Sequence, residues 1–424
     1  MDYKKTNLKN NLRVISVSMP SIQSATVTVW VRTGSRFEEK KVNGISHFLE
    51  HIVFKGSKKR PSAKAISEAV DELGGEFNAG TSKEWTNFYI KARTANLRTA
   101  FDILSDMVIN PLLKEEEIEK EKSVILEEIA MYNDTPMLKI GDVFENLIYQ
   151  GNPLGTDISG TPETIKNVKR DDFVRYRGLH YYPENILVTV AGGSKEKEIL
   201  KLSDEFFGKL PKTGKKQEIP NDKIKQKNPQ LILSKKKVEQ THIIMGFKGD
   251  AVGAKRRFAE SILSAILGGG MSSRLFIEVR EKRALAYAVK TSSEHYLDNG
   301  YLATYAGLDI KRATEAIKVM LDQYWGIADK RYPISVKELK KAKEYIKGNL
   351  ALSLEDTKNV SAFFGIEELL LNKPVTPNEV IKAIDKVSVD EVIEVAKDFF
   401  KPQNLNLAVI GPYKDKNLFK KLLD

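Results

Sequence analysis

The sequence predicts an α+β protein of two duplicated domains, each with a mostly antiparallel β-sheet packed against helices. Alternating apolar residues in runs such as 25–32 and 89–93 are typical of antiparallel strands with one buried face. A segment near the middle of the chain also reappears near its end, which indicates a duplication. With 424 residues, the chain is long enough to form two cores.

The repeat has a constant spacing. Residues 171–193 superpose on residues 390–412 with an offset of 219 positions (390 minus 171). This offset pairs five identical residues: Asp171 with Asp390, Pro183 with Pro402, Asn185 with Asn404, Val190 with Val409, and Gly192 with Gly411. Between the halves, residues 210–237 are rich in Lys, Asn, Pro and Gln, as linkers are. We therefore expect a domain over 1–208, a linker over 209–230 and a second domain over 231–424.

Apolar spacing assigns the remaining elements of the first half. It predicts helices near 44–55, 62–74, 95–109 and 114–131, which would cover one face of the sheet. In the second half, the strand-like run 241–250 resembles residues 25–35, and a short loop and an apolar helix follow each of them. The two domains should therefore share one fold.

The stretch His47-Phe48-Leu49-Glu50-His51 carries the clearest chemical signal. On a helix, His47 and His51 stack one turn apart on one face, with Glu50 beside them. The chain has only five histidines, so this spacing is informative. Imidazole nitrogens suit zinc, and a catalytic zinc commonly takes three protein ligands and a water molecule. Glu50 would then be the general base that accepts a proton from zinc-activated water.

A third ligand should come from the acidic helix near 114–131. Its buried stripe leaves Glu121 and Glu128, two turns apart, together on another face. Most glutamates of such a run are a solvated face, so the pattern alone leaves several candidates open. The chain has no cysteine, which excludes thiolate ligands and leaves His and carboxylate as the expected zinc set.

The five-residue motif, followed by Glu121 and Glu128 in "EKEKSVILEEI", resembles the pitrilysin/insulinase family of zinc peptidases. The resemblance implies that Glu128 completes a site for one Zn²⁺ per chain and that Glu121 assists catalysis. Glu127 is the nearest rival ligand, because a one-residue slip would exchange the two. The Val-Ile-Leu-x-Glu spacing favours Glu128. The length matches short two-domain members, such as the mitochondrial processing peptidase β subunit and its bacterial homologues.

Two further segments fit the same family. In "GGEFNAGTSKEWTNFYIKA", Asn78 and Ala79 fall on a strand that the family uses as an exposed edge for extended substrate. In "GGGMSSRLFIEVREKRALAYAV", Arg280 and Tyr287 match a pair that points at the substrate and the tetrahedral intermediate.

The second half lacks the metal residues. Aligning Gly34 with Gly249 places aliphatic residues opposite the zinc motif: Ile262, Ala265 and Ile266 stand where the first half has His47, Glu50 and His51. A similar alignment sets Asn349 opposite Glu128. The second domain should therefore keep the scaffold and bind no zinc.

The family resemblance also implies an assembly. A two-domain chain would form half of a clamshell, and a homodimer would enclose peptide or unfolded polypeptide substrates. Arg280 and Tyr287 of one subunit would then lie near the zinc site of the other. The alternative is a non-catalytic core, assembly or peptide-holding subunit of the same family, against which the intact motif argues. A metal hydrolase acting on another bond is less consistent with the edge strand, and the ligands alone also admit manganese or cobalt.

Composition excludes other classes of protein. A composition of 41% hydrophobic and 29% charged residues is typical of a folded protein. The sequence shows neither the apolar core of a signal peptide nor a membrane span. We therefore expect a cytoplasmic protein without a membrane partner. The net charge of +11 comes from lysines interspersed with glutamates, and no nucleic-acid motif accompanies them, so no nucleic-acid partner is expected.

Overall fold

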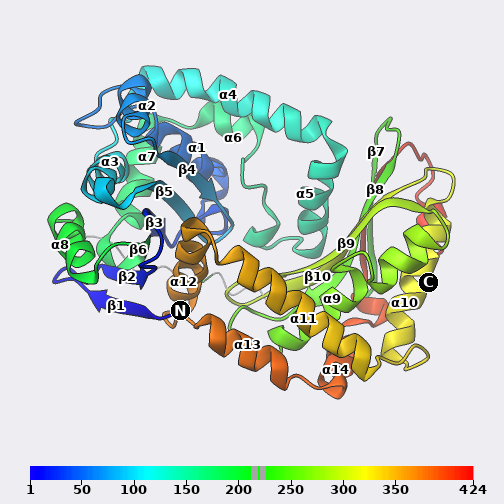
Figure 1. Cartoon of the computed structure of the whole chain (residues 1–424). Coiled ribbons are helices and arrows are strands. Elements are labelled where there is room, and N and C mark those ends of the chain that lie inside the picture. The colour runs from blue at the N-terminus through cyan, green and yellow to red at the C-terminus, as the bar shows by residue number, and fades with distance from the viewer. Residues whose placement is uncertain (212–217, 220–225, 424) are drawn as a thin grey trace. The chain divides into compact units, whose positions relative to one another are not determined.

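The computed structural model describes residues 1–211, 218–219 and 226–423, which form two compact units (Figure 1). The first unit comprises residues 1–130, 156–220 and 351–378, and the second comprises 131–155, 221–350 and 379–424. Much of the predicted linker, residues 212–217 and 220–225, lies outside the described part of the chain. Each unit is built around one sheet.

The sheet of the first unit has the strand order β1-β2-β6-β3-β5-β4. Its strands are β1 (Tyr3–Asn7), β2 (Arg13–Ser18), β3 (Ser24–Val31), β4 (Glu76–Thr81), β5 (Thr86–Arg93) and β6 (Ile186–Gly192). All neighbours are antiparallel except the parallel pair β2 and β6. Strand β4 ends the sheet and pairs only with β5, so its other edge keeps open main-chain groups.

One face of this sheet is covered by helices from the first half of the chain. These helices are α1 (Ile45–Val53), α2 (Ala63–Asp71), α3 (Leu97–Ile109), α4 (Glu115–Asp134), α6 (Pro162–Asn167), α7 (Arg170–His180) and α8 (Glu196–Phe207). Side chains alternate between the two faces of the sheet along β3. Val27, Val29 and Val31 point to the helix-covered face, where they share a core with Phe48 of α1 and Phe101 of α3. The four helices predicted for this half are therefore confirmed.

The opposite face of the first sheet is covered by α12 (Thr357–Leu371), which comes from the second half of the chain. The other set of β3 side chains faces this helix: the hydroxyl oxygens of Thr26 and Thr357 lie 2.8 Å apart. Gly365 is needed for this packing, because a Cβ there would lie 2.6 Å from Nε1 of Trp30.

The second unit repeats this topology, with the order β7-β11-β8-β10-β9. Its strands are β7 (Gln230–Lys235), β8 (Thr241–Gly249), β9 (Ala286–His295), β10 (Gly300–Leu308) and β11 (Asn406–Gly411). Its helices from the second half are α9 (Arg257–Gly268), α10 (Ala313–Ala328), α11 (Val336–Ser353), α13 (Pro377–Lys386), α14 (Val389–Phe399) and α15 (Asn417–Lys420), together with the π-helical turn η6 (Phe276–Glu281). Again a single parallel pair, β7 with β11, joins an otherwise antiparallel sheet. The predicted duplicated α+β fold is confirmed.

The two units exchange one helix each. Helix α5 (Pro136–Ile148) comes from the first half of the chain but packs on the second sheet, with Phe144 beside Ala408 and Ile410 of β11. Its counterpart by sequence offset is α12 (357 minus 136 gives 221), which packs on the first sheet. The compact units are therefore discontinuous in sequence, while the contiguous boundaries 1–208 and 231–424 stay a prediction about the duplicated segments.

Within the described residues, we find no helix that combines the length and apolarity needed to cross a membrane.

The second unit buries one carboxyl group in its core. Glu260 of α9 is fully buried, and its Oε2 accepts a hydrogen bond from the Asp250 amide at 3.1 Å. Its Oε1 has no hydrogen-bond partner in the part of the chain that the structure describes. His295 Nδ1 lies 4.0 Å from Oε2. Burial raises the pKa of Glu260 to about 8, although Arg256 nearby favours the charged form.

We expect Glu260→Gln to remove a pH-dependent destabilisation. Since the folded pKa lies above the unfolded one, the wild type gains stability from the neutral group at acidic pH and loses it as pH rises through about 8. Each pKa unit corresponds to about 1.4 kcal/mol. In urea denaturation with a chelator present throughout, the variant should match the wild type at acidic pH and exceed it in mildly alkaline buffer. The exposed control Glu281→Gln should show no such pH-dependent gain in stability over the wild type. Equal pH profiles for wild type and Glu260→Gln would contradict the assignment.

Candidate metal centre

Helix α1 presents the zinc motif on one face because its other face is committed to the core. Its apolar residues are almost fully buried: Ile45, Phe48, Leu49, Ile52 and Val53. The helix therefore cannot rotate without exposing them. The polar face carries His47 and His51, whose ring centroids lie 4.6 Å apart.

Helix α4 brings the third ligand candidate to these imidazoles. Its Ile118, Ile125 and Ile129 are buried, which turns Glu121 and Glu128 toward α1. Oε2 of Glu128 lies 3.7 Å from Nε2 of His47 and 3.6 Å from Nε2 of His51. Thus two imidazole nitrogens and one carboxylate oxygen converge on one point.

The geometry of this group fits zinc. One potential ligand atom from each residue lies within 4.8 Å of the others, and among the described residues no other His/Cys/Asp/Glu group meets this criterion. Ligand atoms around a tetrahedral zinc lie roughly 3.4 Å apart, given bonds of about 2.0–2.1 Å. The observed separations need only a small adjustment, so His47, His51 and Glu128 can hold one Zn²⁺.

Glu121 orients one of the ligands. Its Oε1 lies 2.9 Å from Nδ1 of His51, and its Oε2 lies 2.6 Å from Nζ of Lys55 in the turn after α1. A proton on Nδ1 donated to this carboxylate leaves Nε2 of His51 free to bind metal. Lys55 was not predicted from the sequence, because it lies in the turn after α1 and meets Glu121 only through the tertiary contact with α4.

The electrostatics differ between the two imidazoles. Burial, with a smaller effect of His51, lowers the pKa of His47 to about 4, so this ring is neutral near pH 7. Burial also opposes the charged form of His51, but the hydrogen bond with Glu121 and the nearby carboxylates outweigh it and raise the pKa. Burial of Glu121 is likewise outweighed by its bonds to His51 and Lys55, which lower its pKa. Glu121 therefore acts as a fixed anion beside His51.

Glu50 is anchored by strand β4. Thr81 Oγ1 donates a hydrogen bond to Oε2 of Glu50 at 2.5 Å. Burial raises the pKa of Glu50, and the bond from Thr81 partly offsets this effect. Thr81 could not be predicted from the sequence, because only the tertiary structure brings β4 beside α1.

Asn78 and Ala79 lie on the same edge strand, β4. Asn78 is exposed, and its Oδ1 accepts a hydrogen bond from the Ala79 amide at 2.8 Å. A peptide that pairs with this edge would have to displace the Asn78 side chain from that amide.

Arg280 and Tyr287 lie in the second unit, on η6 and β9. The guanidinium carbon of Arg280 lies 4.8 Å from the ring centroid of Phe276 and 5.7 Å from that of Tyr287. Tyr287 is 75% exposed, and within the described residues Arg280 makes no ion pair. Both residues line a pocket of about 510 Å³ whose wall is partly apolar. This pair is available to a ligand or to a partner chain.

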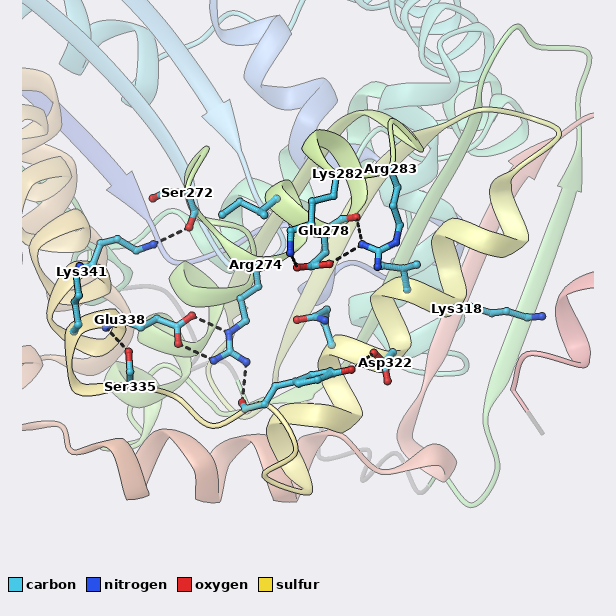
Figure 2. Close-up of a pocket in the computed structure, with 15 residues that line it drawn as sticks. Ser272, Arg274, Glu278, Lys282, Arg283, Lys318, Asp322, Ser335, Glu338 and Lys341 are labelled. Atoms are coloured by element: carbon cyan, nitrogen blue, oxygen red, sulfur yellow. Dashed lines mark hydrogen bonds and ion pairs between the residues drawn. The ribbon is translucent and has the colours of Figure 1, made fainter.

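A larger pocket of about 890 Å³ in the second unit contains none of the predicted site residues (Figure 2). Ion pairs neutralise much of its charge: Arg274 binds Glu338 at 2.7 Å, and Glu278 binds both Lys282 and Arg283 at 2.6 Å. Size alone therefore does not indicate the reactive site.

Two repeated α+β folds and a His-His-Glu group define a class of zinc-binding proteins, and comparison with known proteins identifies the family. Residues 13–162 match the profile "Insulinase (Peptidase family M16)", and residues 167–346 match "Peptidase M16 inactive domain". The chain belongs to the insulinase family, peptidase family M16.

Similar proteins cover nearly the whole chain. An "uncharacterized zinc protease", YmxG of Bacillus subtilis, is 36% identical over 96% of this chain and 98% of its own length. The crystal structure of a protease from Helicobacter pylori superposes with a TM-score of 0.90 at 26% identity, covering 97% of this chain and 99% of that one. A chain of complex III2 from Candida albicans has the same fold, with a TM-score of 0.85 at 19% identity over 99% of each chain. The first two, which are named as proteases, support a peptidase-type enzyme, and the name of the Bacillus relative adds zinc. The third supports the fold alone.

We predict that Glu128, and not Glu127, binds the metal. Glu128→Gln removes an anionic ligand and should leave the purified protein with little zinc after dialysis, whereas Glu127→Gln should keep about one zinc per chain. Glu127 is the matched control, because it is the exposed neighbour on the same helix. Zinc content measured by mass spectrometry checks this; loss of metal only from Glu127→Gln would reverse the assignment.

Proposed function

We propose that this chain is a zinc-dependent endopeptidase that hydrolyses peptides or unfolded polypeptides. The observation that carries the proposal is that His47, His51 and Glu128 converge on one point beside Glu50. Glu50 is in turn hydrogen-bonded to β4, the edge strand of the first sheet. Similar proteins are named zinc proteases, which supports peptide hydrolysis as the class of reaction.

In this mechanism, His47, His51 and Glu128 hold zinc, which when bound lowers the pKa of a water molecule and polarises a carbonyl group. Glu50 accepts the proton of the attacking water and then delivers it to the leaving amine nitrogen. Thr81 holds the Glu50 carboxylate in one orientation while these transfers occur. Glu121 keeps His51 in its binding tautomer and thereby assists catalysis.

We propose that β4 binds the substrate backbone. Asn78 and Ala79 lie at a sheet edge whose main-chain groups can extend the sheet by one peptide strand. Thr81 is on this same strand, so a paired substrate would run beside the residue that anchors the base. Main-chain pairing explains how peptides of varied sequence would be accepted.

We further propose a homodimer in which Arg280 and Tyr287 of one subunit serve the zinc site of the other within a closed chamber. Tyr287 is exposed, and among the described residues Arg280 has no ion-pair partner. Both observations support this role, since the two side chains could stabilise a developing oxyanion. The alternative is a non-catalytic core or peptide-holding subunit. It would not require an oriented base, and the Thr81 bond to Glu50 favours the enzyme.

Glu50→Gln should keep zinc but lose nearly all turnover, because the amide cannot accept the proton of water near neutral pH. A mixture of unstructured peptides, analysed by mass spectrometry with and without a chelator, tests both parts. We expect cleavage by the wild type, and none by the chelated enzyme or the variant. Full activity of zinc-loaded Glu50→Gln would refute Glu50 as the base, and intact peptides with zinc-loaded wild type would favour the non-catalytic alternative.

Mixing two inactive variants tests the shared site. If Arg280 acts across the dimer, a mixed dimer of Glu50→Gln and Arg280→Ala contains one site with both groups intact, and an equal mixture should regain about a quarter of wild-type activity. Each variant alone should stay inactive or nearly so. If Arg280 instead serves its own chain, the mixture should be no more active than the mean of the two variants.

A further inference from the structure

The first turn of α1 lacks a capping side chain at its own N-cap position. The N-cap residue is Gly44, with φ of 97° and no side chain. A Cβ there would lie 2.8 Å from the Ser159 carbonyl oxygen, so Ser, Thr or Asp could not replace it without strain. Acceptors for the free amides of this turn must therefore come from elsewhere in the chain.

Glu38 supplies these acceptors. Its Oε2 accepts a hydrogen bond from the Gly44 amide at 2.7 Å, and its Oε1 accepts one from the Ser46 amide at 2.8 Å. The side-chain amide of Asn43 also donates to Oε2, at 2.8 Å. The Glu38 carboxyl thus lies at the positive end of the helix dipole, which favours a negative charge there. Burial raises the pKa of Glu38, and these hydrogen bonds offset part of that effect.

The surroundings of Glu38 hold this turn on more than one side. Ser46 Oγ lies 2.6 Å from the hydroxyl of Tyr176 on α7, which lies 2.8 Å from Oγ1 of Thr33 after β3. These hydroxyls are buried. Ser46 directly precedes His47, so any displacement of its amide moves the first zinc ligand.

We propose that Glu38 is a positioning residue for the zinc site: its carboxylate fixes the first turn of α1 and thereby aims the His47 imidazole at the metal. Glu38 touches neither zinc nor substrate and acts through the backbone of Gly44 and Ser46. The effect on catalysis rests on the proposed peptidase function, whereas the effect on zinc affinity does not. Because the proposal gives Glu38 no contact with the peptide, its loss should lower kcat and leave KM nearly unchanged.

The test compares Glu38→Gln with Glu39→Gln in the full chain. Glu39 makes the same charge change one residue away, but its exposed side chain pairs with Lys41 and does not reach α1. We measure the zinc dissociation constant by competition with a chelator, the melting temperature of the zinc-free protein, and kcat and KM. Loss of an outer partner of a metal site commonly weakens binding about 10–100-fold, and we expect this for Glu38→Gln, with Glu39→Gln like the wild type.

Glu38→Asp keeps the charge and shortens the side chain, so its zinc affinity should lie between those of the wild type and Glu38→Gln. Unchanged zinc affinity in Glu38→Gln would overturn the proposal, even if the melting temperature fell, because the role would then be structural only. If Glu38→Gln does not fold, Glu38→Asp decides, and wild-type zinc affinity in that variant overturns the proposal. Zinc affinity is measured without peptide, so an inactive wild type would refute the peptidase function separately.

Discussion

The metal centre depends on the docking of α1 into the core of the first unit. Successive residues of a helix are rotated by about 100°, so the buried face of Phe48, Leu49 and Ile52 fixes where His47 and His51 point. Phe48 also packs edge to face on Phe173 of α7, with ring centroids 5.0 Å apart. A rotation of α1 by one position would bury charged groups and turn both imidazoles away from Glu128. Apolar packing therefore orients the reactive groups.

Sequence alone predicted the parts of the site that depend on local periodicity. The spacing of His47, Glu50 and His51 follows from one turn of helix. Glu121 and Glu128 lie two turns apart on another helix, but the family resemblance, and not this spacing, selected them from several glutamates. Helix α4 does bring both glutamates to α1, as expected. Thr81 and Glu38 escaped prediction because their partners lie on other elements, and neither side chain has a distinctive spacing within its own segment. Their roles exist only in tertiary contacts.

The fold shows the same division between local and long-range information. Strand alternation and helix periods predicted two antiparallel sheets with helices, but not the exchange of α5 and α12. An apolar stripe records that a helix face is buried, without recording which sheet it covers. The polar contact between Thr26 and Thr357, and the need for glycine at position 365 against Trp30, are the signals that match α12 to the first sheet. These two signals can be recognised only when it is known that α12 packs against this sheet.

The charges of the two units differ in a way that explains where zinc belongs. Around the imidazoles, Glu50, Glu121 and Glu128 bring three carboxylates, and Lys55 brings one ammonium group. With neutral imidazoles this cluster is therefore doubly negative, which a divalent cation balances. The corresponding helix of the second unit, α9, carries aliphatic residues and one buried carboxyl, Glu260, whose raised pKa favours the neutral form. A carboxyl can be buried either opposite a cation or with a proton; Glu121 beside Lys55 shows the first solution, and Glu260 of α9 shows the second.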